Sequence, residues 1–269
     1  MIYFIGAGPG DPELLTRKAW RILGEASVIL HDALLDSEQL RNNFPMAQWI
    51  NVGKRASKPS VDQRFTCRLM IALAKRGDTV VRLKGGDPTI FGRISEEIEA
   101  CRGHNIAFEI VPGITAACAA AADLQASLTR RGISRSVVFV TPSVGKGERA
   151  GSNEWLRASL AADTVVIYMA GAQAKAVARA LLEGGKSPMT PLCVVENASQ
   201  NGAREKFTLG QVAQHGLRRY SGPLSLLLGD AFGAAEAEQT VLGRAMRASM
   251  FSTGAAGVDI SARRKYEST

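Results

Sequence analysis

The sequence predicts an α/β fold made of two α/β domains in series, with an active-site cleft between them. Short apolar, β-branched stretches alternate with helix-length segments through the first half, which is typical of a largely parallel sheet. A second alternating set begins after an irregular, basic stretch at residues 124–135. We therefore expect domains at residues 1–113 and 114–233. Residues 234–269 are rich in Ala, Gly, Ser and charge, which indicates a flexible or surface-lying extension.

The first-half elements follow from periodicity and turn residues. Apolar side chains fall on one side of residues 13–23, and residues 61–76 show the same helical period. A small, alanine-rich helix is expected at 114–122. The expected strands lie at 2–5, 28–30, 49–52, 79–83 and 108–111. In such sheets ligands bind beyond the carboxyl ends of the strands, so the glycine-rich and charged turns there are the first candidates for a site.

The second half repeats this alternation. Its expected strands lie at residues 136–140, 164–168, 192–195, 206–209 and 224–228. Helices are expected at residues 154–160, 174–182 and 209–214. The two halves resemble each other only in architecture, and they leave a cleft between them.

Composition and length limit the classes of protein to which the chain can belong. The 269 residues are 46% hydrophobic, enough for real cores, and no apolar run is long enough to span a bilayer. The N-terminus begins as a strand without the basic flank of a signal peptide, so we expect a cytoplasmic protein that does not bind membranes. The cysteines lack metal-type spacing and are expected to be reduced core residues; they are Cys67, Cys101, Cys118 and Cys193.

The net charge of +8 indicates an anionic partner. Nucleic acid is disfavoured because the basic residues are dispersed and only 6% of the chain is aromatic. A polycarboxylate fits the charge equally well. The turn at residues 6–11 resembles a dinucleotide fingerprint, but Pro9 and Asp11 break its spacing, which argues against a nicotinamide cofactor.

The most informative stretch is residues 80–93, where a buried-type strand runs into Gly85 and Gly86. Two adjacent residues without side chains let the backbone approach a ligand closely. Asp87 adds a fixed acceptor, and Arg93 adds a planar, permanently charged fork. For the glycine pair taken alone, the alternative interpretation is an ordinary strand-to-helix turn with no ligand.

Further motifs occur in a fixed order along the chain. They are GAGPGD at 6–11, LLT at 14–16, HDAL at 31–34, GKR at 53–55, RLKGGDPTIFGR at 82–93, VPGITA at 111–116, LTRR at 128–131 and YM at 168–169. Over nearly all of residues 2–232 the chain thereby resembles the tetrapyrrole methylase family. Its glycine-turn string and the GKR before it are similar to those of the uroporphyrinogen-III C-methyltransferases.

The resemblance implies methyl transfer from S-adenosylmethionine to C2 and C7 of uroporphyrinogen III, with precorrin-2 and S-adenosylhomocysteine as products and no metal. It also implies a homodimer. The alternatives are a methyltransferase for a later precorrin, or a non-catalytic binder of an anionic ligand or nucleic acid on the same fold. The eight carboxylates of the implied substrate would account for the basic charge.

The resemblance also implies residue roles. The implied cofactor contacts are Pro9, Gly85, Gly86, Asp87, Ile90, Thr115, Ala116, Met169 and Ala198. Asp32 matches the family's proton acceptor and Lys54 its proton donor, and Arg93 is implied to hold substrate carboxylates. Weaker candidates for substrate carboxylates are Arg17, Arg55, Arg130 and Arg131.

Some of these residues also fit a purely structural role instead of the implied functional one. Asp32 is also suited to capping a turn, Lys54 and Arg55 to a solvated turn, and Met169 to a core. On an extended strand His31 points away from the face of Asp32, so we interpret His31 as structural. The chain departs from the family pattern at Ile94-Ser95, at Arg130 and at residues 141–143, and we expect Ile94-Ser95 to narrow the substrate side of the cleft.

Overall fold

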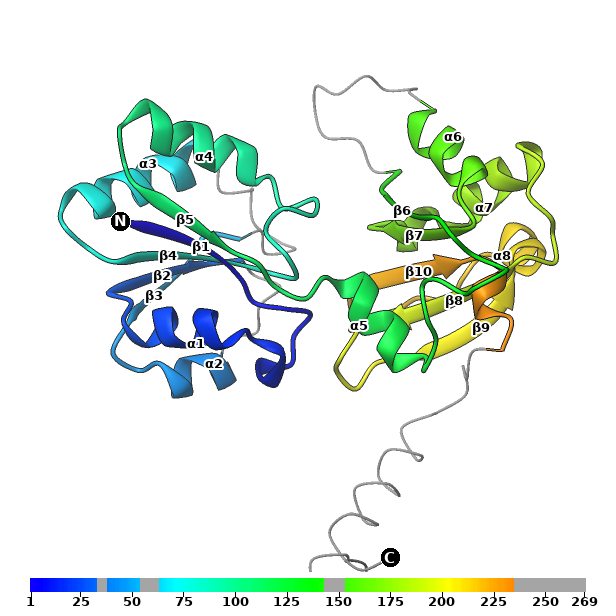
Figure 1. Cartoon of the computed structure of the whole chain (residues 1–269), viewed down its shortest axis with the longest axis horizontal. Coiled ribbons are helices and arrows are strands. Elements are labelled where there is room, and N and C mark those ends of the chain that lie inside the picture. The colour runs from blue at the N-terminus through cyan, green and yellow to red at the C-terminus, as the bar shows by residue number, and fades with distance from the viewer. Residues whose placement is uncertain (33–37, 54–62, 143–152, 235–269) are drawn as a thin grey trace, which may run out of the picture.

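A computed structural model describes residues 1–32, 38–53, 63–142 and 153–234 of the chain. Two five-stranded sheets with their helices form two lobes, and the segment between β5 (Phe108–Val111) and α5 (Ala116–Asp123) runs from one lobe to the other (Figure 1). Lys54, Arg55 and nearly all of the expected extension at 234–269 lie outside the described residues.

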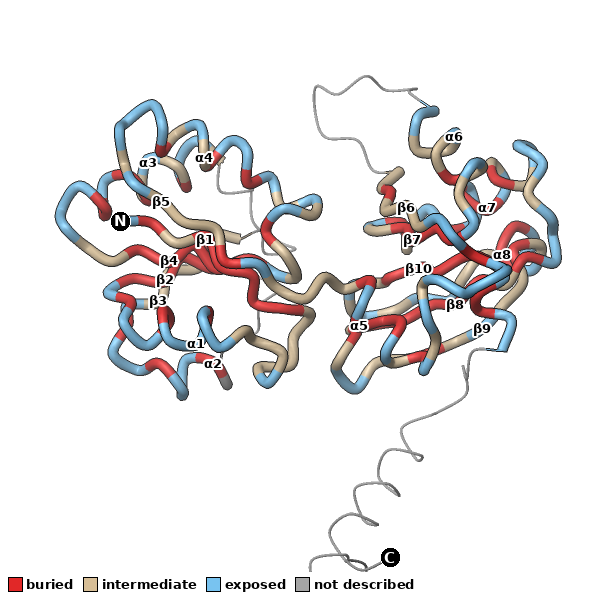
Figure 2. The backbone as a smooth tube through the Cα atoms, viewed as in Figure 1, coloured by how far each residue is buried: buried red, intermediate tan, exposed pale blue. Residues whose placement is uncertain are grey.

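The first sheet is parallel throughout, with strand order β3-β2-β4-β1-β5, as expected. Its other strands are β1 (Ile2–Gly6), β2 (Val28–His31), β3 (Gln48–Asn51) and β4 (Val80–Lys84). Every residue of β2 and β4 is buried, since helices cover both faces of the sheet (Figure 2). β2 is apolar up to His31, and β4 is apolar apart from Arg82 and Lys84, which is why their positions were predictable.

The helices of this lobe form two layers. α1 (Arg17–Gly24) and α2 (Glu38–Asn43) pack on one face, and α3 (Gln63–Lys75) and α4 (Ile94–Gly103) pack on the other (Figure 1). The chain therefore leaves the neighbouring strands β1 and β4 toward opposite faces. This arrangement opens a crevice at the carboxyl ends of those two strands, where α/β sheets bind ligands.

The first helix begins later than predicted. Pro12–Leu14 form a short 3-10 turn capped by Asp11, and α1 starts at Arg17. The hydroxyl of Thr16 accepts a hydrogen bond from the Ala19 amide at 3.1 Å, which satisfies one of the free donors at a helix start. The prediction that this helix starts at residue 13 is therefore wrong. The apolar side chains keep a helical spacing from residue 13 onward, but the Thr16 cap sets the start of the helix at Arg17.

The second sheet is mixed, with strand order β6-β7-β10-β8-β9. Its strands are β6 (Val137–Val140), β7 (Thr164–Tyr168), β8 (Pro191–Glu196), β9 (Arg204–Thr208) and β10 (Leu224–Leu228). β10 runs antiparallel to both β7 and β8, and β9 runs antiparallel to β8. The expected α/β alternation does not hold for β8 and β9, because residues 197–203 are too few for a crossover helix.

Helices cover both faces of the second sheet as well. α5 packs on one face, against Val166, Cys193 and Leu227. On the other face lie α6 (Glu154–Ala161), α7 (Ala174–Glu183) and α8 (Leu209–His215). No described helix is both long and apolar enough to cross a membrane.

The four thiols are unpaired, and they differ in burial. Cys101 and Cys193 are buried, and burial raises the pKa of both thiols to about 11. Cys67 is half-buried, and Cys118 is exposed on α5, where a core position had been expected. The two buried thiols are therefore poor nucleophiles.

Three glycines allow the strand ends of the first sheet to meet. Gly6 ends β1, Gly86 follows β4 and Gly113 follows β5. A Cβ on Gly113 would lie 2.3 Å from the Gly86 carbonyl oxygen and 2.7 Å from the Gly6 Cα. All of these neighbours are backbone atoms, so no side-chain movement can relieve the clash.

Gly113→Ala is therefore expected to destabilise the fold by about 1–3 kcal/mol, the usual cost of overpacking. The matched control is Gly103→Ala at the end of α4, where an added Cβ meets no atom within 4 Å. Urea unfolding of both variants measures the difference. Equal midpoints for Gly113→Ala and the wild type would contradict the close backbone approach.

Candidate active site

A cavity of about 1000 Å³ lies at the carboxyl ends of β1 and β4 and reaches the loops of the second sheet. Its lining comes from both lobes, so the cleft expected between the two α/β units exists. Most of the site residues predicted from the sequence line it, namely Pro9, Asp32, Gly85, Gly86, Asp87, Ile90, Arg93, Thr115, Ala116 and Met169.

Backbone forms one wall of this cavity. The Gly86 amide donates to the Gly8 carbonyl at 2.7 Å, and the Gly8 amide donates to the Gly86 carbonyl at 3.2 Å. Gly86 has φ +66°, a left-handed conformation that favours glycine. A Cβ on Gly85 would meet no atom within 4 Å. The wall is thus a pair of cross-linked loops with open space beside Gly85.

Asp87 ties this wall to the next strand end. Its Oδ1 accepts hydrogen bonds from the Thr89 amide at 2.8 Å and the Thr89 hydroxyl at 2.5 Å. Its Oδ2 accepts from the Gly113 amide at 3.0 Å. Each carboxylate oxygen has a second lone pair, so Oδ2 can accept a further hydrogen bond from a ligand.

The opposite wall is aromatic. Tyr168 ends β7, and its hydroxyl lies 2.6 Å from the Thr115 hydroxyl and accepts from the Ala117 amide at 3.1 Å. Burial raises the pKa of Tyr168, so the phenol stays neutral. The Phe91 ring packs on Tyr168 at 5.3 Å between centroids, which joins the two lobes across the cavity. Met169 follows with φ +57° and is 56% exposed, so it is not a core residue.

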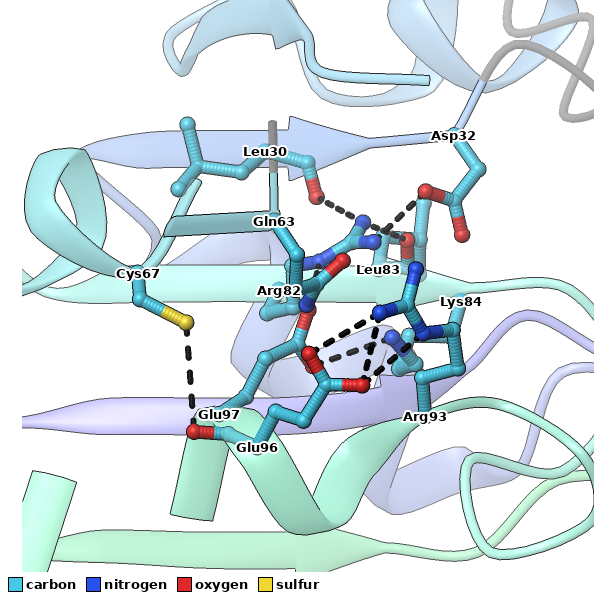
Figure 3. Close-up of polar contacts among 10 residues, drawn as sticks. All are labelled: Leu30, Asp32, Gln63, Cys67, Arg82, Leu83, Lys84, Arg93, Glu96 and Glu97. Atoms are coloured by element: carbon cyan, nitrogen blue, oxygen red, sulfur yellow. Dashed lines mark hydrogen bonds and ion pairs between the residues drawn. The ribbon is translucent and has the colours of Figure 1, made fainter. Parts of the chain in front are cut away.

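A network of four charges, Asp32, Arg82, Lys84 and Glu97, lies at the carboxyl end of β4 (Figure 3). Arg82 donates from Nη2 to Asp32 Oδ1 at 2.5 Å and from Nε to Glu97 Oε1 at 2.9 Å. Lys84 donates to Glu97 Oε2 at 2.9 Å, and Gln63 donates to Oε1 at 3.1 Å. Arg82 and Lys84 alternate on one face of β4 toward α4, and Glu97 is completely buried. Two cations thus surround one buried carboxylate.

The environment shifts the pKa values of both Arg82 and Lys84. Burial opposes the charge on Arg82, but the carboxylates of Asp32 and Glu97 outweigh it and raise the pKa of Arg82. Burial and the neighbouring charge of Arg82 lower the pKa of Lys84, against the attraction of Glu97. The pair therefore contains one permanent cation and one that loses its proton more easily than a free lysine.

Arg93 lines the same cavity and is exposed. Its Nε and Nη2 donate to the two oxygens of Glu96, each at 2.9 Å, and both side chains are exposed. The next residue, Ile94, is buried in the core between the sheet and α4. Neither Ile94 nor Ser95 is among the cavity-lining residues, and a narrower cleft at this departure stays a prediction.

Several predicted residues are not part of the lining. Arg17 lies in a separate depression with Trp20 and Asn43. Arg130 and Arg131 are exposed beside the Arg130–Ser134 bridge. Ala198 is buried in the core of the second lobe, which leaves the neighbouring Gln200 at the cavity.

His31 is structural, as we interpreted it. It is buried, its Nδ1 donates to the Asp32 carbonyl at 3.1 Å, and its ring packs on Trp49. It therefore fixes the backbone of Asp32, whereas the Asp32 side chain contacts Arg82 on the other face of β2.

Sequence reasoning missed two groups of lining residues. Arg82 and Lys84 are charged residues at alternate positions of an otherwise apolar strand, which is itself a signal of a buried network. Arg218, Arg219 and Tyr220 come from the loop between α8 and β10, which carries no motif. Arg218 stacks on the Tyr220 ring at 4.2 Å and pairs with Glu205. Among the described residues, Arg219 is the cavity arginine without a carboxylate partner.

Adjacent glutamates allow a direct test of the buried network. Glu97→Gln is expected to destabilise the fold by about 3–5 kcal/mol, because it leaves buried cations without their counter-charge. Glu96→Gln removes an exposed pair and is expected to cost about 0–1 kcal/mol. Urea unfolding of both variants at one pH measures the two costs. Equal destabilisation by the two substitutions would contradict the buried network.

Comparison with known proteins identifies the family. Residues 1–214 match the Tetrapyrrole (Corrin/Porphyrin) Methylases. The chain is 40% identical to the uroporphyrinogen-III C-methyltransferase of Cyanidium caldarium, over 84% of this chain and 91% of that protein. It is 42% identical to the siroheme synthase of Psychrobacter cryohalolentis, over 85% of this chain and 44% of that protein.

A solved structure supports the same assignment. The uroporphyrin-III C-methyl transferase of Thermus thermophilus, complexed with S-adenyl homocysteine, superposes with a TM-score of 0.75 at 34% identity. The match covers 86% of this chain and 98% of that one. From its sequence and its fold, this chain belongs to the tetrapyrrole methylase family.

Proposed function

We propose that this protein is an S-adenosylmethionine-dependent C-methyltransferase that methylates uroporphyrinogen III at C2 and C7 to give precorrin-2. The observation that carries the proposal is the cavity itself, where a backbone wall from the first lobe, an aromatic wall formed by Phe91 and Tyr168 of the two lobes, and Asp32 all meet. The high identity to an enzyme named for this reaction, along most of both chains, supports the choice of substrate.

The cavity fits the methyl donor. Gly85 leaves open space where a side chain would stand, so the donor's backbone-like methionine end can lie against the wall. Asp87 retains acceptor capacity for its amino group, and Ile90 and the exposed Met169 offer apolar surface to the adenosine. When bound, S-adenosylmethionine supplies an electrophilic methyl group on a positively charged sulfur.

The protein's part in the reaction is then orientation and proton handling. Holding an electron-rich pyrrole carbon in line with the methyl group is worth up to about 7–11 kcal/mol of the barrier. The macrocycle gains positive charge and must lose a proton, which we assign to the Asp32 carboxylate. Lys54 is the corresponding donor by resemblance. Its position lies outside the described residues.

Arginines at the rim are proposed to bind the substrate carboxylates. Arg93 commits Nε and Nη2 to Glu96, which leaves Nη1 for a substrate. Arg219 reaches the cavity from the second lobe and is proposed in place of Arg17, Arg130 and Arg131. These groups recognise a tetrapyrrole by its carboxylates, through charge-assisted hydrogen bonds.

Further features remain proposals that rest on the family resemblance. We propose a homodimer in the cytoplasm, with no nucleic-acid or membrane partner. The division into domains 1–113 and 114–233 agrees with the separate sheets and cores. The product would feed the branch of the pathway that leads to sirohaem, cobalamin or haem d1.

The function is tested by anaerobic incubation of the protein with uroporphyrinogen III and S-adenosylmethionine, followed by mass analysis. The substrate mass is expected to rise by two methyl increments, with one S-adenosylhomocysteine released for each. Methylation of a later precorrin alone would favour the neighbouring activity in the family. Cofactor binding without any rise in mass would contradict methyl transfer and favour a binding protein.

A further inference from the structure

Arg82 connects a buried carboxylate to one at the cavity. Its side chain is only 4% exposed, and it lies between Glu97, which is 0% exposed, and Asp32, which is 33% exposed (Figure 3). Asp32 is the group proposed above as the proton acceptor, so the following inference rests on the proposed function. The contacts place Arg82 as the link between the protein interior and that group.

Asp32 needs such a link because of its place in the chain. It follows the last residue of β2, where the sheet no longer fixes the backbone by strand pairing. His31 holds its carbonyl, and Arg82 holds its Oδ1. No described residue binds Oδ2. Within the described part of the chain, the carboxylate is therefore held through Oδ1 alone, and Asp32 itself lines the cavity.

Arg82 is itself fixed from several directions. Its Nε donates to Glu97, and its Nη1 donates to the carbonyls of Leu30 at 3.4 Å and Leu83 at 3.0 Å. The register of β2 and β4 pairs Leu30 with Arg82, so the guanidinium extends along β2 toward Asp32. A planar guanidinium whose donors bind separate acceptors has little freedom to rotate.

Stability alone does not account for these buried charges. Buried ion pairs often contribute no more than well-packed apolar residues of the same volume, because desolvation offsets their attraction. The other positions of β4 are apolar apart from Lys84. The presence of a buried charge network that ends at a cavity instead favours a role at that cavity.

We propose that Arg82 and Glu97 are positioning residues for the reaction. Glu97 fixes the guanidinium of Arg82, and Arg82 fixes the Asp32 carboxylate so that Oδ2 faces the substrate carbon that loses its proton. Neither positioning residue takes up the proton. Their effect on turnover passes entirely through Asp32.

A double-mutant cycle on kcat tests this inference. Arg82→Lys keeps the charge but cannot reach both carboxylates, and it is expected to lower kcat by about 10–10²-fold, the cost of a small misplacement. Asp32→Asn is expected to lower kcat by about 10²–10⁴-fold. If Arg82 acts through Asp32, the double variant is no slower than Asp32→Asn alone.

The dissociation constant for S-adenosylhomocysteine should stay within about twofold of the wild type in all three variants, because a group acting only on proton transfer leaves cofactor affinity unchanged.

Leu181→Ala provides the control for general destabilisation. Leu181 is fully buried on α7 in the second core and does not line the cavity. Combined with Asp32→Asn it is expected to change kcat by the product of the two single effects. If Arg82→Lys does not fold, Glu97→Asp serves in its place, because it keeps every charge and withdraws the carboxylate by one methylene.

The outcomes are distinct. Multiplicative effects of Arg82→Lys and Asp32→Asn, or full kcat in Arg82→Lys, would overturn the positioning role while leaving methyl transfer intact. A wild-type protein that methylates no tetrapyrrole would overturn the proposed function and this inference with it.

Discussion

The site depends on how closely three strand ends approach one another at the carboxyl edge of the first sheet. Gly6, Gly86 and Gly113 meet backbone to backbone, at distances that leave no room for a Cβ on Gly6 or Gly113. The Gly8–Gly86 hydrogen bonds and the Asp87–Gly113 contact then hold the loops after β1, β4 and β5 as one surface. Because that surface is backbone, it presents fixed dipoles and open space to a ligand.

The charged groups beneath and above this surface have different burial and so different roles. Glu97, Arg82 and Lys84 are buried, and the two cations are balanced by two carboxylates, those of Glu97 and Asp32. The exposed Arg93 and Arg219 offer positive charge at the rim, where a polycarboxylate would arrive. This separation explains how a basic protein keeps a permanent arginine beside its proposed proton acceptor without presenting it to solvent.

The sequence predicted the parallel first sheet, the cleft and most of its lining, because buried strands and glycine turns are local signals. The mixed second sheet was not predicted, since antiparallel pairing of β8 and β9 depends on the short link at 197–203. Arg17, Arg130 and Arg131 are charged residues near motifs, and the sequence does not reveal which way such side chains lie. The role of Arg82 required knowing that β2 and β4 are neighbours.

We propose that the open space beside Gly85 binds the methyl donor. The most direct measurement is the dissociation constant of S-adenosylhomocysteine for Gly85→Val, with Gly103→Val as the matched variant, since a Cβ at either glycine meets no protein atom within 4 Å. A side chain in the ligand's place should cost about 1–3 kcal/mol, so Gly85→Val is expected to bind about 5–150-fold more weakly, with Gly103→Val unchanged. Wild-type affinity in Gly85→Val would contradict the account.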